Sequence, residues 1–253
     1  MVDKVIMKSQ PDNNTKLYIN CFSSCIGTLV AEVATLPLCT IKTIYQNNKN
    51  YTIPETVNSI IKTQGVRGFF TASSPAIITQ VLSTSSKFTL YEKIKHMRKT
   101  EKSNVFDNSI NGVISGLAGS LITHPFDVWK NFTQRNENYW LHLKKSASNG
   151  SLIKTGLYPG YTGSIGKNIA LYSALFPLND FYKSKFDSIY VSAPLTTLTV
   201  SLIVQPFDYY KVVKVAGNIP SQPFRGFTLM LARNIPHFTI TMLMTDWISK
   251  QIQ

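Results

Sequence analysis

Charged residues are absent from six long stretches of the chain, and these stretches set its predicted architecture. They are residues 17–31, 68–86, 108–123, 168–179, 188–207 and 234–245. Together these stretches are rich in Ser, Thr and Gly as well as apolar residues, so hydropathy alone would identify only some of them. A helix that turns one face to lipid and another to a polar cavity has this mixed composition. The pattern predicts an all-α membrane protein with six transmembrane helices around a central cavity.

A short motif, Pro-x-acid-x-x-Lys, indicates that the chain is built from three repeats. Its copies begin at Pro37, Pro125 and Pro206, 88 and 81 residues apart, and the first copy has Cys39 in place of the acid. Similar fragments at nearly fixed spacing indicate repeated structural units. We therefore predict three two-helix repeats related by a pseudo-threefold axis. The predicted repeats are residues 17–99, 105–187 and 188–251, after an N-terminal tail at 1–16.

A second set of landmarks gives the length of the second helix in each repeat. An acid near the end of that helix follows a small residue by 20 positions; the pairs are Ala72 with Glu92, Gly160 with Asp180, and Gly226 with Asp246. Twenty helical residues span about 30 Å, the thickness of a bilayer hydrocarbon core. The motif proline precedes the small residue by 35 positions in repeats 1 and 2 but by 20 in repeat 3. We expect this shorter loop to lack a short helix.

The acid and the lysine of each proline motif are three residues apart, so they lie side by side on a helix. In a threefold ring, the acid of one repeat can reach the lysine of the next. The predicted ion pairs are Asp127 with Lys211 and Asp208 with Lys42. Because Cys39 has no carboxylate, we expect Lys130 to lack an ionic partner. The alternative is three unrelated pairs on helix surfaces, but matched spacing in three copies argues against it.

The far ends of the second helices carry another set of charges. These are Glu92 with Lys95, Asp180 with Lys183, and Asp246, which is followed by Ser249 where a base is expected. Two ionic rings at opposite ends of one cavity predict an alternating gate, in which one ring closes while the other opens.

The charge balance admits another class of protein. The formal net charge of +13 would also suit a basic soluble protein that binds nucleic acid. The basic residues, however, lie between the uncharged stretches and form no single patch, which favours contact with anionic lipid headgroups over nucleic acid. The three cysteines and four histidines show no spacing typical of metal ligands. With no nucleophile–base pair and no phosphate loop, we predict neither an enzyme nor a cofactor or metal site.

Over residues 17–250 the chain resembles the mitochondrial carrier family. That family has Pro-x-[Asp/Glu]-x-x-[Lys/Arg] on its odd helices and [Phe/Tyr]-[Asp/Glu]-x-x-[Lys/Arg] on its even helices, and Tyr91-Glu92-Lys93-Ile94-Lys95 matches the second motif in full. Gln46 and Gln134 match glutamines that brace the ion pairs in the family, whereas repeat 3 has Val215 there. Phe224-Arg225-Gly226 resembles an element of the family implicated in cardiolipin binding.

The resemblance implies a monomeric, multi-pass carrier of the mitochondrial inner membrane that works by alternating access. It implies a matrix-side gate of Lys42, Asp127, Lys130, Asp208 and Lys211, braced by Gln46 and Gln134. It implies a cytoplasmic-side gate of Tyr91, Glu92, Lys95, Asp180, Lys183 and Asp246.

Threefold spacing also predicts a binding level. Thirteen residues before the distal acids lie Thr79, Lys167 and Arg233, followed by Gln80, Asn168 and Asn234. By resemblance these six residues occupy the family's three substrate contact points. Cations at membrane depth normally face a water-filled path, although a lysine can also extend to the interface. Two cations at one level predict a small anionic substrate.

The class of anion stays open between a nucleotide and a carboxylate. Glu32, the sole charge between residues 17 and 41, would contact a substrate amine or temper the positive field, which keeps an amino acid or other zwitterion as an alternative. A partner-paired structural acid is the simpler interpretation of Glu32. A degenerate relative of the same fold that transports nothing is the remaining alternative.

Overall fold

Six long helices dominate the protein. The computed structural model describes residues 13–98, 104–186 and 189–252, and this part of the chain is helical and contains no strand. The long helices are α1 (Asn13–Asn47), α3 (Ser73–Met97), α4 (Val105–Gln134), α6 (Tyr161–Lys185), α7 (Ile189–Val215) and α8 (Phe227–Ile252). Each has 25 to 35 residues, and helices of that length can cross a bilayer core. The all-α class predicted from the sequence is therefore confirmed for the described residues.

Short helices join the long ones in the first two thirds of the chain. They are α2 (Ile53–Gln64) and η1 (Val66–Phe70) after α1, and α5 (Tyr139–Ser148) and η2 (Leu152–Leu157) after α4. A capping box starts α2, because the Thr52 hydroxyl accepts from the Glu55 amide and the Glu55 carboxylate accepts from the Thr52 amide. The connection 216–226 between α7 and α8 contains no helix, as its shorter length led us to expect.

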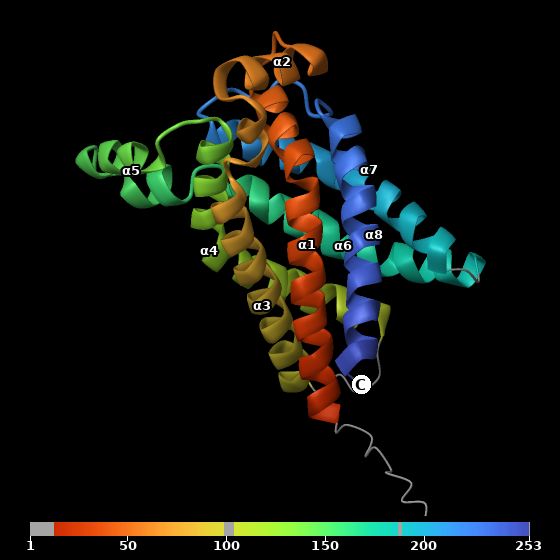
Figure 1. Ribbon diagram of the computed structural model, residues 1–253. Coiled ribbons are helices and arrows are strands. Elements are labelled where there is room, and N and C mark those ends of the chain that lie inside the picture. Colours follow the sequence, from red (N-terminus) through yellow and green to blue (C-terminus); the bar gives the residue numbers. More distant parts are fainter. Residues whose placement is uncertain (1–12, 99–103, 187–188, 253) are drawn as a thin grey trace, which may run out of the picture.

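The long helices pack as a closed ring. Along the chain α1 packs against α3, α3 against α4, α4 against α6, α6 against α7 and α7 against α8, and α8 returns to α1 (Figure 1). Small residues permit the approach of α4 to α6: a Cβ added at Gly116 would lie 2.3 Å from Cε2 of Tyr172. The end of the ring that carries α2 lies opposite the C-terminus in Figure 1. We call it the short-helix end.

The three motif prolines lie inside long helices. Pro37 is within α1, Pro125 within α4 and Pro206 within α7, and each helix continues for about ten residues beyond its proline. Each motif therefore lies in the last third of its helix, near the short-helix end. The fold thus brings the motif acids and lysines of three separate segments to one level of the ring.

The polarity of the protein is inverted relative to that of a soluble domain. Among the described residues, the buried ones include more polar and charged side chains than apolar ones, while large apolar residues such as Val33, Ile122 and Leu202 are exposed. An apolar outer surface suits lipid as the surrounding solvent. Within the described residues only Phe22–Asn47 is apolar enough on average to be recognised as a span. The polar inner face lowers the mean hydropathy of the other long helices.

Candidate functional site

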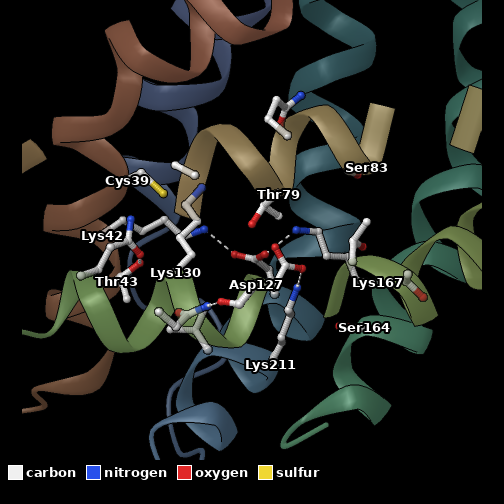
Figure 2. Close-up of a pocket in the computed structure, with 18 of the residues that line it drawn as sticks. Cys39, Lys42, Thr43, Thr79, Ser83, Asp127, Lys130, Ser164, Lys167 and Lys211 are labelled. Carbon is white, nitrogen blue, oxygen red and sulfur yellow. Dashed lines mark hydrogen bonds and ion pairs between the residues drawn. The ribbon is translucent and has the colours of Figure 1, made fainter. Parts of the chain in front are cut away.

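A polar cavity of about 230 Å³ lies inside the ring, toward the short-helix end (Figure 2). Six cations line it: Lys42, Lys87, Lys130, Lys167, Lys211 and Arg233. Two carboxylates, Asp127 and Asp208, line it as well. A low-dielectric wall strengthens the field of such a cluster. The cavity is therefore a site that favours anions.

Asp208 on α7 is the most heavily paired carboxylate of the cavity lining. Its Oδ2 accepts from Lys42 on α1, and its Oδ1 accepts from Lys167 on α6 at 2.6 Å. The carboxylate is only 7% exposed, because the two cations cover it. Lys42 is the partner expected from the sequence, whereas Lys167 was predicted as a substrate contact. One side chain thus joins the level of the proline motifs to the predicted binding level.

Glu32 on α1 repeats this arrangement in another part of the ring. Its Oε1 accepts from Lys130 on α4, and its Oε2 accepts from Arg233 on α8 at 2.6 Å. The expectation that Lys130 has no ionic partner is therefore wrong. Glu32 precedes Cys39 by seven residues, which is two helical turns, so the two positions face the same way. The carboxylate missing from position 39 is supplied by Glu32, two turns earlier in α1.

The placement of Glu32 also bears on its predicted contact with substrate. Its side chain is 1% exposed, and the residue is not part of the cavity wall. A substrate amine could reach this carboxylate only after one of its two cations had moved away. Glu32 is therefore a structural acid paired with Lys130 and Arg233, the simpler of the two interpretations given above.

Among the residues that the structure describes, Asp127 on α4 has a single ionic partner. Lys211 on α7 donates to its Oδ2 at 2.5 Å, which is the pairing expected from the sequence, and Figure 2 shows Lys211 reaching toward Asp127. Asp127 is 26% exposed, much more than the two doubly paired carboxylates. The three carboxylates thus differ in exposure and in number of ionic partners, and Asp127 is the most accessible from the cavity.

The predicted contact residues are only partly gathered at the cavity. Thr79, Gln80, Lys167, Asn168 and Arg233 line it, but Asn234 does not. The Asn234 side chain instead donates to the Ser201 hydroxyl at 3.1 Å and so ties α8 to α7. Asn168 also has a structural bond, because it donates to the Gly116 carbonyl at 3.2 Å.

The two glutamines make different contacts. The Gln134 carbonyl accepts from Thr43 at 2.8 Å and ties α4 to α1 beside the ion pairs. Gln46 donates to the Arg225 carbonyl at 3.1 Å, so it holds the connection between α7 and α8. Only Gln134 is part of the cavity wall.

Arg225, part of the element that resembles one implicated in cardiolipin binding, makes its contacts within the protein. Its Nε donates to the Tyr45 carbonyl at 2.8 Å, and its Nη2 donates to the carbonyls of Asn48 and Tyr51, both at 2.6 Å. Its guanidinium also lies 3.9 Å from the centre of the Tyr45 ring. These contacts hold the shortened connection against the end of α1.

The far gate is described only in part. The side chains of Glu92, Lys95 and Asp246 lie outside the described residues, whereas Asp180 and Lys183 are exposed near the end of α6. The Tyr91 hydroxyl donates to the Asn108 side chain at 3.1 Å and so links α3 to α4. The cytoplasmic-side gate therefore stays a prediction.

Sequence reasoning missed Lys87 and Ser83 on α3 and Ser164 on α6, all of which line the cavity. Lys87 carried a signal that could have found it. It is the first charged residue after the uncharged stretch 68–86, and it follows Gln80 by seven residues, so both fall on one helix face. The serines carry no such signal, because Ser is common throughout these helices.

Comparison with known proteins gives several related sequences. A family model described as "Mitochondrial carrier protein" matches residues 13–102. A mitochondrial carrier-like protein of Acanthamoeba polyphaga mimivirus is 37% identical over 242 residues, covering 92% of this chain and 97% of the viral protein. The mitochondrial thiamine pyrophosphate carrier 1 of Meyerozyma guilliermondii is 29% identical over 57% of this chain and 55% of its own length. The mitochondrial 2-oxodicarboxylate carrier of Bos taurus is 26% identical over 69% of this chain and 67% of its own length.

Proposed function

The chain belongs to the mitochondrial carrier family, whose members are solute transporters, and we propose that it moves a small anionic metabolite by alternating access. The same proposal includes six spans in three repeats, a monomer in the mitochondrial inner membrane, exchange of one substrate for another, and lipid neighbours such as cardiolipin. The observation that carries it is the sharing of Asp208 and Glu32. Each carboxylate holds one lysine of a proline motif and one cation of the predicted binding level.

Shared carboxylates provide a physical link between substrate and gate. An anion that binds Lys167 competes with Asp208, and one that binds Arg233 competes with Glu32. Either event weakens a carboxylate that also holds a gate lysine, Lys42 or Lys130. A ligand shifts a conformational equilibrium only through different affinities for the two states. Here the difference would come from cations that are paired in the closed state and free for substrate when the pairs open.

The cavity favours an anion over a zwitterion. Among the described residues six cations face two lining carboxylates and the buried Glu32, so an excess of positive charge remains after these three carboxylates are counted. The relatives named for thiamine pyrophosphate and 2-oxodicarboxylate are named for anions as well. Carboxylates and phosphates therefore both remain candidate groups.

Uptake into liposomes tests the proposal. Purified protein would be reconstituted and given labelled 2-oxoglutarate, thiamine pyrophosphate or ATP against internal unlabelled substrate. We expect uptake of at least one anion by the native protein and its loss in Lys167→Gln, because Lys167 lines the cavity. Lys185→Gln is the matched control, since Lys185 is exposed at the end of the same helix.

Two results would overturn the proposal. One is a folded native protein that neither takes up nor is thermally stabilised by any of these anions. The other is undiminished uptake by Lys167→Gln. A true substrate should raise the melting temperature by mass action even where transport is slow.

A further inference from the structure

Lys87 is the one cation of the cavity lining that the proposed gate does not use. The five others each pair with Glu32, Asp127 or Asp208. Within the described residues Lys87 makes no hydrogen bond or ion pair, although it lines the same cavity. A charge at membrane depth is costly unless a partner or water compensates it. A cation that lines a polar cavity without a direct ion pair among the described residues is therefore a place for an anion.

The position of Lys87 is defined by packing against α4. A Cβ added at Gly119 would lie 2.8 Å from Cγ of Lys87, so the lysine stem lies directly against this glycine. Thr79, Gln80 and Ser83 share the cavity-facing side of α3 with Lys87, and Figure 2 shows Thr79 and Ser83 on that helix beside the ion pairs. Lys87 thus ends a polar stripe that begins at the predicted binding level.

The threefold pattern shows how Lys87 differs from the two binding-level cations that are held by carboxylates. Asp208 holds an even-helix cation of repeat 2, Lys167, and Glu32 holds one of repeat 3, Arg233. The equivalent cation for Asp127 would come from repeat 1, where the matching position is Thr79. Repeat 1 supplies Lys87 instead, eight residues or about 12 Å farther along its helix.

We propose that Lys87 is the first anchor for an anionic group of the substrate, and that a transported substrate carries at least two such groups. This inference rests on the proposed function. One group binds Lys87 without breaking any protein ion pair. A second group of the same substrate competes for Lys167 or Arg233, which line the same cavity, and so loosens Asp208 or Glu32. A substrate with a single anionic group would occupy Lys87 and leave the gate pairs intact.

The experiment compares four proteins in liposomes: native, Lys87→Gln, Lys87→Arg and Lys93→Gln. Lys93 lies on the same helix but is exposed, so its variant is the matched control. The probes are 2-oxoglutarate, thiamine pyrophosphate and 2-oxovalerate; the last has the five carbons of 2-oxoglutarate but a single carboxylate. We expect Lys87→Gln to raise the half-saturating concentration of a transported probe by roughly 10- to 100-fold, the range for one lost charged hydrogen bond. Lys87→Arg should remain within a few fold of the native protein, and 2-oxovalerate should not be transported.

The possible outcomes separate transport itself, the role of Lys87 and the need for two anionic groups. If native protein takes up 2-oxovalerate but neither 2-oxoglutarate nor thiamine pyrophosphate, the two-anion inference fails although the chain is still a carrier; if it takes up none of these and no ATP, the proposed function fails. If native uptake occurs and Lys87→Gln equals Lys93→Gln, Lys87 is not an anchor, although the chain is still a carrier. If 2-oxovalerate is transported as well as 2-oxoglutarate, the requirement for two groups is overturned. A melting temperature for each variant without probe separates a folding defect from a binding defect.

Discussion

Glu32→Gln is the substitution that most directly tests how the cavity is held together. The change keeps the size of the side chain and removes its charge. It leaves Lys130 and Arg233 without their carboxylate, because both bind Glu32. The prediction is a large loss of stability from one conservative substitution on the inner face of α1.

The expected loss of stability follows from the burial of Glu32 and from its sharing between two cations. Removing one partner of a buried ion pair costs about 3–5 kcal/mol, since the other charge stays buried and unpaired. Two pairs are lost here, but energies within one network do not add. Lys130 and Arg233 are 13% and 21% exposed, so cavity water offsets part of the cost. We therefore expect about 3 kcal/mol, the low end of that range. At roughly 2–4 °C per kcal/mol for a chain of this size, the melting temperature should fall by about 6–12 °C.

Thermal unfolding of the purified protein in detergent is the assay, with Glu137→Gln as the control. Glu137 pairs with Arg135 at 2.9 Å but is 46% exposed. Exposed pairs contribute about 0–1 kcal/mol, so this control should lower the melting temperature by less than about 4 °C.

A compensating variant sharpens the test. Adding Cys39→Asp to Glu32→Gln returns a carboxylate to the same face of α1, two turns away, where the proline motifs of the other repeats carry their acid. We expect it to recover part of the lost stability. Equal melting temperatures for Glu32→Gln and Glu137→Gln would refute the reasoning, because they would show that Glu32 does not hold the two cations.

Two further predictions concern other contacts of the ring. Reversing the charges of Asp127 and Lys211 together should restore uptake lost in either single reversal, because these two residues pair with each other and with no other charge of the described residues; a double variant as inactive as the single ones would contradict the inter-repeat bridge. Gly116→Ala should destabilise the protein by about 1–3 kcal/mol, because its methyl group would lie 2.3 Å from the Tyr172 ring; an unchanged unfolding temperature would contradict the close approach of α4 to α6.

Much of the framework could be predicted because it depends on local periodicity. Uncharged stretches of helical length gave the long helices, and the length of each loop showed where a short helix is absent. The partners of Asp127 and Asp208 could be anticipated from the motif spacing, since repeated helices place equivalent residues at equivalent levels. Average hydropathy was a poorer guide, because the inner faces are polar and only Phe22–Asn47 passes that measure among the described residues.

The sequence by itself determined the helices, the repeated motif and the excess of cations, all of which depend on the types of residue and their spacing along the chain. Only the tertiary structure decided how the charges are shared. Glu32 reaches Lys130 from two turns before the motif position, and Asp208 and Glu32 each take a second cation from another long helix. Lysine and arginine side chains are long enough to bridge such offsets, so spacing along the chain does not fix their partners. The cavity, its unpaired Lys87 and its link to the gate exist only once six helices close the ring.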